Sequence, residues 1–154
     1  MTTTPRTAIV PVTEIFDLRH AVLRPGLPPE SAVFAEDDLP DVFHVAAYDE
    51  GGAVVACATF FPEPLADCDA PAHRIRGMAS AATVRGRGYG AAVLEAGLAE
   101  AAARGARVVW CNGRTVARGF YERHGFKVIG EEFEVEGIGP HFVCAREIAA
   151  PAAG

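Results

Sequence analysis

The sequence lacks several features that would assign it to a well-known functional class. It has no excess of basic residues, because 14 Lys and Arg stand against 20 Asp and Glu, for a formal net charge of −6 at pH 7. A nucleic-acid-binding domain normally shows a basic face, so we expect no nucleic-acid partner. No apolar run approaches the ~20 residues of a membrane-spanning helix. Met1 to Pro11 also lacks the basic and apolar segments of a secretory signal. We therefore expect a cytoplasmic protein with no membrane partner.

Disulfide and metal-binding patterns are missing as well. The 4 cysteines, Cys57, Cys68, Cys111 and Cys144, show neither a CxxC pair nor a Cys/His ligand spacing. Cys57, Cys111 and Cys144 lie inside apolar runs, where a reduced cysteine behaves as a small hydrophobic side chain. We therefore expect neither a disulfide scaffold nor a metal site.

The sequence does have the composition of an ordinary globular domain. Its residues are 50% hydrophobic and 22% charged, which is close to average usage. A chain of 154 residues is long enough to bury a core without covalent cross-links. Neither a repeat nor a linker divides it, so we expect a single domain over residues 1–154.

Periodicity and turn residues predict strands and helices in alternation. Thr13 is a candidate N-cap for a helix that Arg24-Pro25-Gly26 would end, and Asp49–Gly52 predicts a hairpin turn. The expected helices cover Thr13–Leu23, Ala91–Arg104 and Thr115–His124, and Leu27–Asp41 is expected to be a loop with one short helix around Ser31–Phe34. The expected strands cover Thr7–Val12, Val42–Tyr48, Ala53–Phe61, His73–Ser80, Val108–Cys111, Phe126–Phe133 and His141–Ile148. This order predicts an α/β (α+β) fold, in which a mixed sheet has helices on both faces.

The most distinctive segment is Arg85-Gly86-Arg87-Gly88-Tyr89-Gly90, which comes directly before the expected helix at Ala91. Glycine tolerates positive φ and lets a ligand approach the backbone. The first turn of a helix leaves N–H groups unpaired at the positive end of the helix dipole. With two arginine side chains beside them, these groups predict a site for a phosphate or pyrophosphate. The alternative is a glycine-rich connection with exposed arginines.

Two other phosphate-binding patterns fit this segment less well. The pattern GxxxxGK[ST] needs a Gly-Lys pair, and the sequence has none. Gly86, Gly88 and Ala91 satisfy a loose GxGxxA dinucleotide pattern. However, Ala81–Val84 separates these glycines from the preceding strand, and no acidic residue ends the next strand at Trp110–Arg114 to hold a ribose. A Rossmann-like dinucleotide-binding protein is therefore the less favoured alternative.

Two segments resemble the GCN5-related N-acetyltransferase (GNAT) superfamily. Arg85–Gly90 matches that family's cofactor motif of Arg or Gln, two residues, Gly, one residue, then Gly or Ala. Downstream, Ala117–Phe126 resembles the A-x-x-F-Y-x-x-x-G-F helix of the family, and Arg76–Ser80 resembles its splayed fourth strand. The resemblance is specific over Arg74–Phe126. It implies the GNAT fold, with a mixed, mostly antiparallel central sheet and helices on both faces.

The resemblance also implies an activity. The chain would move an acetyl group from acetyl-CoA, its co-substrate, to a primary amine of a small molecule or protein, by direct attack in a ternary complex. A non-catalytic acyl-CoA-binding module of the same fold is the alternative, but such a module would not need Tyr121. Homodimers are common in the family, so a homodimer is a further candidate partner state.

Individual site residues follow from the matched positions. The backbone of Met78, Ala79 and Ser80 would pair with pantetheine. The N–H groups of Arg85, Gly86, Arg87, Gly88, Tyr89 and Gly90 would bind the pyrophosphate. Tyr121 would protonate the departing thiolate, or else serve only as a core aromatic residue. The family often carries Asn seven residues before that tyrosine, where this chain has Arg114, with Asn112 two residues earlier; either is a candidate cofactor contact.

The general base stays open. The fourth strand has no carboxylate, although the family often has a Glu there. Glu132 and Glu134 alternate with Phe133 and would share one face of a strand. His141 follows a rigid glycine- and proline-rich turn that could direct it to the acceptor, and His44 is a further candidate.

Two arginines of the fourth strand have two alternative interpretations. Arg74 and Arg76 alternate with Ile75 and would project from one face. They would either hold an acceptor carboxylate or form salt bridges at the surface.

Overall fold

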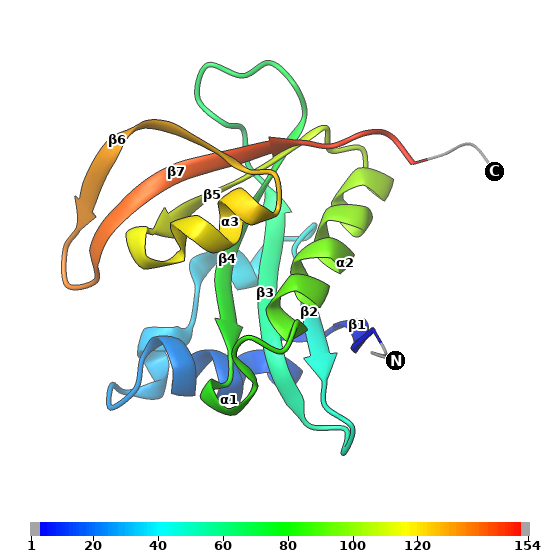
Figure 1. The fold of residues 1–154 in the computed structure, drawn as a ribbon, viewed down its shortest axis with the longest axis vertical. Coiled ribbons are helices and arrows are strands. Elements are labelled where there is room, and N and C mark those ends of the chain that lie inside the picture. Colours follow the sequence, from blue (N-terminus) through cyan, green and yellow to red (C-terminus); the bar gives the residue numbers. More distant parts are fainter. Residues whose placement is uncertain (1–3, 152–154) are drawn as a thin grey trace. The chain divides into compact units, whose positions relative to one another are not determined.

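The structure is a computed structural model that describes residues 4–151. Residues 1–3, part of the segment compared above with a secretory signal, lie outside the described residues. The strands and helices are β1 (Arg6–Val10), α1 (Val12–Leu23), β2 (Phe43–Tyr48), β3 (Val54–Pro62), β4 (Ala72–Ser80), α2 (Tyr89–Ala103), β5 (Val108–Arg114), α3 (Arg118–Arg123), β6 (Lys127–Val135) and β7 (Gly139–Glu147) (Figure 1). Short 3-10 helices cover Pro29–Ala32, Ala35–Asp38, Ala82–Val84 and Thr115–Ala117.

The sheet is mixed and mostly antiparallel. Within residues 4–151 it has seven strands in the order β1-β2-β3-β4-β5-β7-β6. β4 and β5 run parallel, whereas β1–β2, β2–β3, β5–β7 and β6–β7 are antiparallel pairs. The predicted α+β class is therefore confirmed. The Rossmann-like alternative does not fit, because a doubly wound sheet is mostly parallel.

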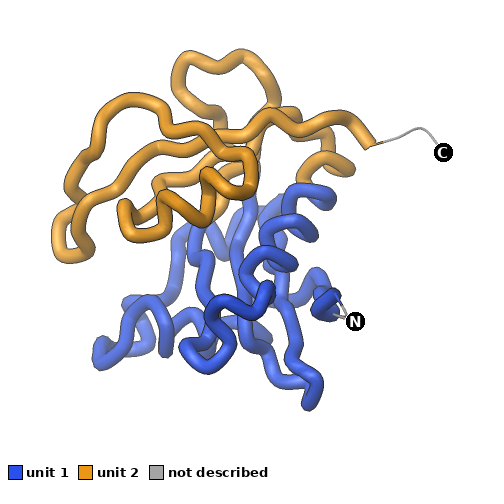
Figure 2. The backbone as a smooth tube through the Cα atoms, viewed as in Figure 1, with its two compact units in different colours: residues 1–61, 76–100 blue, residues 62–75, 101–154 orange. Residues whose placement is uncertain are grey.

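The chain divides into two compact units (Figure 2). Unit 1 holds the residues up to 61 together with 76–100, and unit 2 holds 62–75 together with the residues from 101 onwards. The chain passes from one unit to the other inside β4, since 72–75 belong to unit 2 and 76–80 to unit 1.

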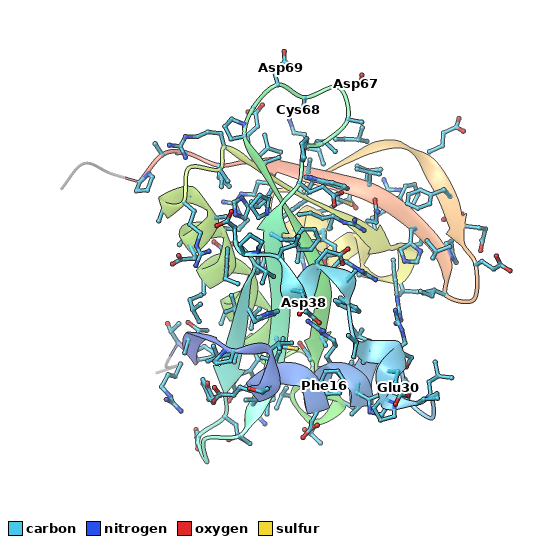
Figure 3. The ribbon with its side chains drawn as sticks, turned by 180° about the vertical axis from the view of Figure 1, so that it is seen from behind. Phe16, Glu30, Asp38, Asp67, Cys68 and Asp69 are labelled. Atoms are coloured by element: carbon cyan, nitrogen blue, oxygen red, sulfur yellow. The ribbon has the colours of Figure 1, made fainter. Side chains whose placement is uncertain are left out.

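In unit 1, two helices cover opposite faces of β3. Ile15 of α1 belongs to the same buried cluster as Cys57 of β3. Gly97 of α2 lies instead against Phe60 of β3. Successive side chains of a strand point to opposite faces, so Cys57 and Phe60 face opposite ways. From behind, α1 with Phe16 lies in front of the strands of unit 1 (Figure 3). Helices on both faces are thus confirmed for this unit.

Most element boundaries agree with the sequence-based prediction, but the starts of two helices differ. α1 begins at Val12 rather than after Thr13, because Pro11 takes the N-cap position with extended backbone (φ −65°, ψ 155°) and no side chain caps the helix. The fixed φ of proline suits such a start. α2 begins at Tyr89 rather than Ala91, directly after Gly88 with its φ of +88°. The Thr13 cap was therefore wrong, and Tyr89 belongs to the helix rather than to the turn.

Unit 2 is built around β5. This strand pairs with residues 72–75 of β4 on one side and with β7 on the other. Trp110 is 7% exposed and packs with Ala72 and Val108, and its indole N–H donates a hydrogen bond to the Glu63 carbonyl at 2.9 Å. Trp110 therefore belongs to the core of this unit. The helix expected over Thr115–His124 is split into a 3-10 turn and α3.

Two further observations concern the chain as a whole. Among residues 4–151, no helix is long and apolar enough to cross a membrane. All four cysteines are free.

Candidate functional site

The glycine-rich turn of unit 1 is open to solvent. After the 3-10 turn ends at the buried Val84, residues 85–88 are all exposed. Gly86 and Gly88 have φ values of +79° and +88°, a conformation that glycine adopts without strain. A Cβ atom built at either position would meet no atom within 4 Å. The backbone is therefore both turned sharply and left uncovered.

The start of α2 leaves several backbone N–H groups at this turn without a helical partner. The Arg87 N–H bonds back to the Val84 carbonyl at 3.1 Å, and the first bond of helical type runs from the Ala92 N–H to the Gly88 carbonyl at 3.0 Å. The N–H groups of residues 89–91 come before that bond, and the first N–H groups of a helix have no partner inside it. They lie at the positive end of the dipole of α2, a helix of 15 residues. Arg85 and Arg87 flank them.

The strand that precedes this turn is kinked. Gly77 of β4 has a φ of +68°, outside the range of regular strands. Ala79 is buried in the cluster that also contains Ile15, whereas Met78 and Ser80 are half-buried. The Ala81 N–H bonds to the Val55 carbonyl at 2.8 Å, so the end of β4 is tied to β3. Met78, Ala79 and Ser80 therefore follow an irregular backbone that is anchored at both ends.

In unit 2, the ring of Tyr121 packs closely against two phenylalanine rings and the backbone of Gly113. Its residue is 5% exposed, and its ring contacts Phe120 and Phe126 edge-on at centroid distances of 5.3 and 5.4 Å. A Cβ atom at Gly113 would lie 3.2 Å from Cε2 and 3.3 Å from Cδ2 of the Tyr121 ring. Only glycine at position 113 leaves full room for this ring.

The Tyr121 hydroxyl meets a pair of thiols. Cys111 and Cys144 are direct cross-strand neighbours on β5 and β7. Burial raises the pKa of Tyr121 well above its ordinary value, and the hydrogen-bonded Cys111 raises it further. A hydrogen bond to Cys144 and burial raise the pKa of Cys111, whereas that bond lowers the pKa of Cys144. The phenol is therefore held in its neutral, proton-carrying form.

The other site residues predicted on β5 and β7 share the opposite face. Asn112 pairs with Val143, and Arg114 pairs with His141. Because side chains alternate along a strand, Asn112, Arg114 and His141 point away from the face of Cys111 and Gly113. The structure thus groups His141 with Arg114, and it separates both from Tyr121 by the thickness of the sheet.

His141 is 6% exposed, and its ring orientation is defined. Its Nδ1 lies 2.8 Å from the Gly139 carbonyl oxygen. Since a carbonyl only accepts hydrogen bonds, Nδ1 carries the proton in this contact, which leaves Nε2 with the lone pair. The ring of Phe133 lies beside it at a centroid distance of 6.0 Å.

The remaining base candidates lie in different surroundings. Glu132 is exposed and accepts a hydrogen bond from the Thr115 hydroxyl at 2.9 Å, and Glu134 on the same strand is exposed as well. His44 belongs to unit 1, is 5% exposed, and has its Nδ1 2.8 Å from the Thr59 hydroxyl oxygen. Burial lowers the pKa of His44, with an opposing contribution from Asp37. Over residues 4–151, no group of three or more His, Cys, Asp or Glu is placed to hold a metal ion.

The two arginines of β4 are engaged by carboxylates of their own units. Arg74 contacts Glu63 at 3.3 Å, and Arg76 contacts Glu36 at 2.6 Å. Of the two interpretations of the sequence, the structure shows salt bridges.

Sequence reasoning missed a second group of residues in unit 1. Arg19 of α1 has 0% exposure and binds Asp37 with two hydrogen bonds of 2.7 and 3.0 Å. Its guanidinium lies over the ring of Phe34, at 4.0 Å from the centroid. Arg19 reads in the sequence as a polar residue on a surface helix, so only its position one turn after Ile15 could have indicated burial.

The chain matches known acetyltransferases in sequence and in fold. Residues 12–126 match the acetyltransferase (GNAT) family. The uncharacterized N-acetyltransferase YitI of Bacillus subtilis strain 168 is 33% identical over 141 residues, which cover 90% of this chain and 93% of that protein. The crystal structure of Escherichia coli ElaA matches with a TM-score of 0.74 and 20% identity, over 93% of this chain and 99% of that one. An aminoglycoside 6′-N-acetyltransferase complexed with coenzyme A matches with a TM-score of 0.73 and 16% identity, over 96% and 99% of the two chains.

Proposed function

The chain belongs to the acetyltransferase (GNAT) family and is an N-acetyltransferase, and from this premise we propose that it transfers an acetyl group from acetyl-CoA to a primary amine of a small molecule or protein by direct attack in a ternary complex. Acyl-CoA is the co-substrate used in this family. The proposal assigns the pyrophosphate to the glycine turn of unit 1 and proton donation to Tyr121 of unit 2.

The observation that carries the proposal is the open turn at residues 85–88. A pyrophosphate needs several N–H donors and positive charge within a small volume. Gly86 and Gly88 leave the space that a side chain would fill, and the first N–H groups of α2 follow directly. Arg85 and Arg87 add two guanidinium groups. The turn can therefore admit a pyrophosphate at Gly86 and Gly88 without moving a side chain.

The kinked end of β4 is the proposed partner of pantetheine. A regular strand inside a sheet has both edges bonded, so a ligand has no backbone groups to pair with. The left-handed residue Gly77 interrupts that regularity just before Met78–Ser80. We assign the amide contacts of pantetheine and of the thioester carbonyl to these three residues. Either Asn112 or Arg114 remains the proposed additional contact from β5.

The reaction itself is a balanced acyl transfer. The neutral amine nitrogen forms a bond to the thioester carbonyl carbon, and the bond from that carbon to the CoA sulfur breaks. The sulfur leaves with the electron pair of this bond, while the nitrogen must lose one proton. One group therefore has to donate a proton and another has to accept one.

We propose that Tyr121 donates the proton to the departing thiolate. Burial and Cys111 hold its pKa above the ordinary value, so the phenol carries its proton across the physiological pH range. A donor must be protonated before the step, and this environment ensures that it is. The phenolate then regains a proton from solvent.

We propose His141 as the proton acceptor; because the sheet separates its ring from Tyr121, a water molecule would have to carry the proton from the amine to Nε2. Its Nε2 carries the free lone pair of the ring when Nδ1 donates to Gly139. Glu132 remains the alternative, because its carboxylate is exposed and already accepts from Thr115. Both residues belong to unit 2, so a variant of each can be compared under the same conditions.

The test is calorimetric titration with acetyl-CoA of the wild type, Gly88→Glu and Gly52→Glu. Gly52 is a matched control within unit 1, since its φ of +86° is close to the +88° of Gly88 and a Cβ there also meets no atom within 4 Å. Gly88→Glu places a negative charge where the pyrophosphate is proposed to bind. We expect it to weaken binding at least about tenfold, or 1.4 kcal/mol, whereas Gly52→Glu should bind like the wild type.

The outcomes separate the parts of the proposal. No saturable binding by the wild type, or equal binding by the wild type and Gly88→Glu, contradicts the cofactor site. An amine screen that measures free CoA then tests chemistry. Tyr121→Phe should lower kcat by about 10²- to 10⁴-fold with little change in KM for acetyl-CoA. The homodimer and the cytoplasmic location stay predictions.

A further inference from the structure

Phe34 contacts the backbone at the kink of β4. A Cβ atom at Gly77 would lie 2.8 Å from Cε2 and 3.4 Å from Cζ of the Phe34 ring. The ring edge therefore lies directly against the backbone of Gly77, at the residue whose φ is +68°. Met78, the first residue assigned above to pantetheine, is the next in the chain.

Two arginines hold this ring from its two faces. The Cζ atoms of Arg19 and Arg76 each lie 4.0 Å from the centroid of the Phe34 ring. Only one guanidinium fits over one face of a ring at this distance, so the two groups cover opposite faces. Each guanidinium is attracted electrostatically to the ring face that it covers. Phe34 itself is 5% exposed, and Arg19 on one face of the ring is fully buried, whereas the side chain of Arg76 on the other face is 33% exposed.

Both arginines are in turn held by carboxylates and carbonyls. Arg19 donates to both carboxylate oxygens of Asp37, to the Ala32 carbonyl at 3.0 Å and to the Thr59 hydroxyl at 2.7 Å. Asp37 also accepts a hydrogen bond from the Phe34 N–H at 3.0 Å. The backbone and the ring of Phe34 are thus both tied to Arg19.

On the outer side, Arg76 bonds to Glu36 at 2.6 Å. Glu36 and Asp37 lie on the same 3-10 helix, Ala35–Asp38. The segment between α1 and β2 therefore encloses the ring through two adjacent carboxylates, each of which pairs with a different arginine. All of these residues belong to unit 1.

We propose that Phe34 is a positioning residue for the acyl-CoA strand. Clamped between Arg19 and Arg76, its ring holds the backbone of β4 in the kinked form at Gly77, and this form presents Met78–Ser80 to pantetheine. The role in acyl-CoA binding rests on the function proposed above, whereas the role in holding β4 does not. A ring of fixed orientation suits this task, because it is rigid and meets the backbone with its edge.

The test compares Phe34→Leu with Phe43→Leu. Phe43 is the matched control, since it is 2% exposed, lies in unit 1 and stacks on Phe60 of β3 at 5.0 Å. Both variants remove the same ring from a buried position, so both should lose stability of about the same size. Two readouts follow: hydrogen exchange at residues 77–80, and the Kd for acetyl-CoA by calorimetry.

We expect amides 77–80 to exchange at least about tenfold faster in Phe34→Leu than in the wild type, because the local opening becomes easier. The Kd for acetyl-CoA should rise at least about tenfold. Phe43→Leu should change neither quantity by more than about twofold, despite its lower melting temperature. If Phe34 had only a structural role, both variants would melt at a lower temperature than the wild type. Their Kd values for acetyl-CoA and their exchange rates at 77–80 would then not differ from each other.

The remaining outcomes are also decisive. Wild-type exchange at 77–80 in Phe34→Leu overturns the proposal. If acetyl-CoA fails to bind the wild type, the proposed function fails, and the exchange data still test the effect on β4 alone. If Phe34→Leu does not fold, Arg76→Ala replaces it, because alanine has no group that can cover the outer face of the ring. Unchanged exchange at 77–80 in that variant likewise overturns the proposal.

Discussion

Gly97 of α2 lies close to Phe60 of β3, and substitution at Gly97 tests how closely the helix packs against the sheet. A Cβ atom at this position would lie 1.9 Å from Cζ and 2.2 Å from Cε1 of Phe60. Carbon atoms in contact lie about 3.5–4.0 Å apart, so the ring or the helix would have to move by about 1.5–2 Å. Phe60 is 0% exposed and stacks on Phe43 at 5.0 Å. The ring therefore has no free space to enter.

We expect Gly97→Ala to lower the free energy of unfolding by about 2 kcal/mol. Overpacking of this kind costs about 1–3 kcal/mol, and the blocked ring places it near the upper end. Alanine in a helix interior recovers about 1 kcal/mol relative to glycine. Urea denaturation of the variant and the wild type measures the difference. With a slope of about 1–3 kcal/mol/M, the midpoint should fall by about 1 M.

The two terms have opposite signs, so the result is decisive. A variant that is more stable than the wild type by about 1 kcal/mol would follow helix propensity alone and would refute the close packing. The double variant Gly97→Ala, Phe60→Leu supplies the control. Leucine shortens the blocking side chain, so the double variant should lose less stability than the sum of the losses in the two single variants. Because α2 begins at the glycine turn, Gly97→Ala should also weaken binding of acetyl-CoA.

Four further predictions concern charged and polar groups. Asp37→Asn leaves the fully buried Arg19 without its carboxylate and should cost about 3–5 kcal/mol in urea denaturation; a loss below about 1 kcal/mol would contradict the buried ion pair. Gly113→Ala places a methyl group 3.2 Å from the Tyr121 ring and should lower kcat about tenfold, and an unchanged kcat would count against the assigned role. The ultraviolet titration curve of the wild type, after subtraction of the curve of Tyr121→Phe, should show this phenol ionising above its ordinary pKa of 10.0, because burial raises the pKa. Ionisation below pH 10 would disprove the packing. Burial lowers the pKa of folded His44, so the unfolded chain binds the proton first and stability should fall as the pH drops below about 6.5, a loss that His44→Gln should remove.

The parts of the fold that were predicted correctly depend on neighbours in the sequence. The hairpin at Asp49–Gly52 and the helix predicted at Ala91–Arg104 follow from turn chemistry and a helical period. Thr13 failed as a cap because Pro11, two residues earlier, already suits the start of α1. Both residues satisfy a local rule, and only the folded backbone decides between them.

For the site, the glycine turn was visible because its chemistry lies within six consecutive residues. The position of His141 relative to β5 was not, because it depends on the register of β5 with β7. A shift of one residue would exchange the two faces. Strand register is set by pairing between distant segments, which no local pattern reports.

The same distinction separates what the sequence by itself determined from what the tertiary structure decided. The glycines at 86 and 88 determined a sharply turned backbone directly before a helix, since φ and the helix dipole are properties of a short segment. The Phe34 stack was decided by tertiary structure alone. Arg19, Phe34 and Arg76 come from a helix, a loop and a strand, and a charged residue with 0% exposure is stable only where folding brings Asp37 and Thr59 to its guanidinium.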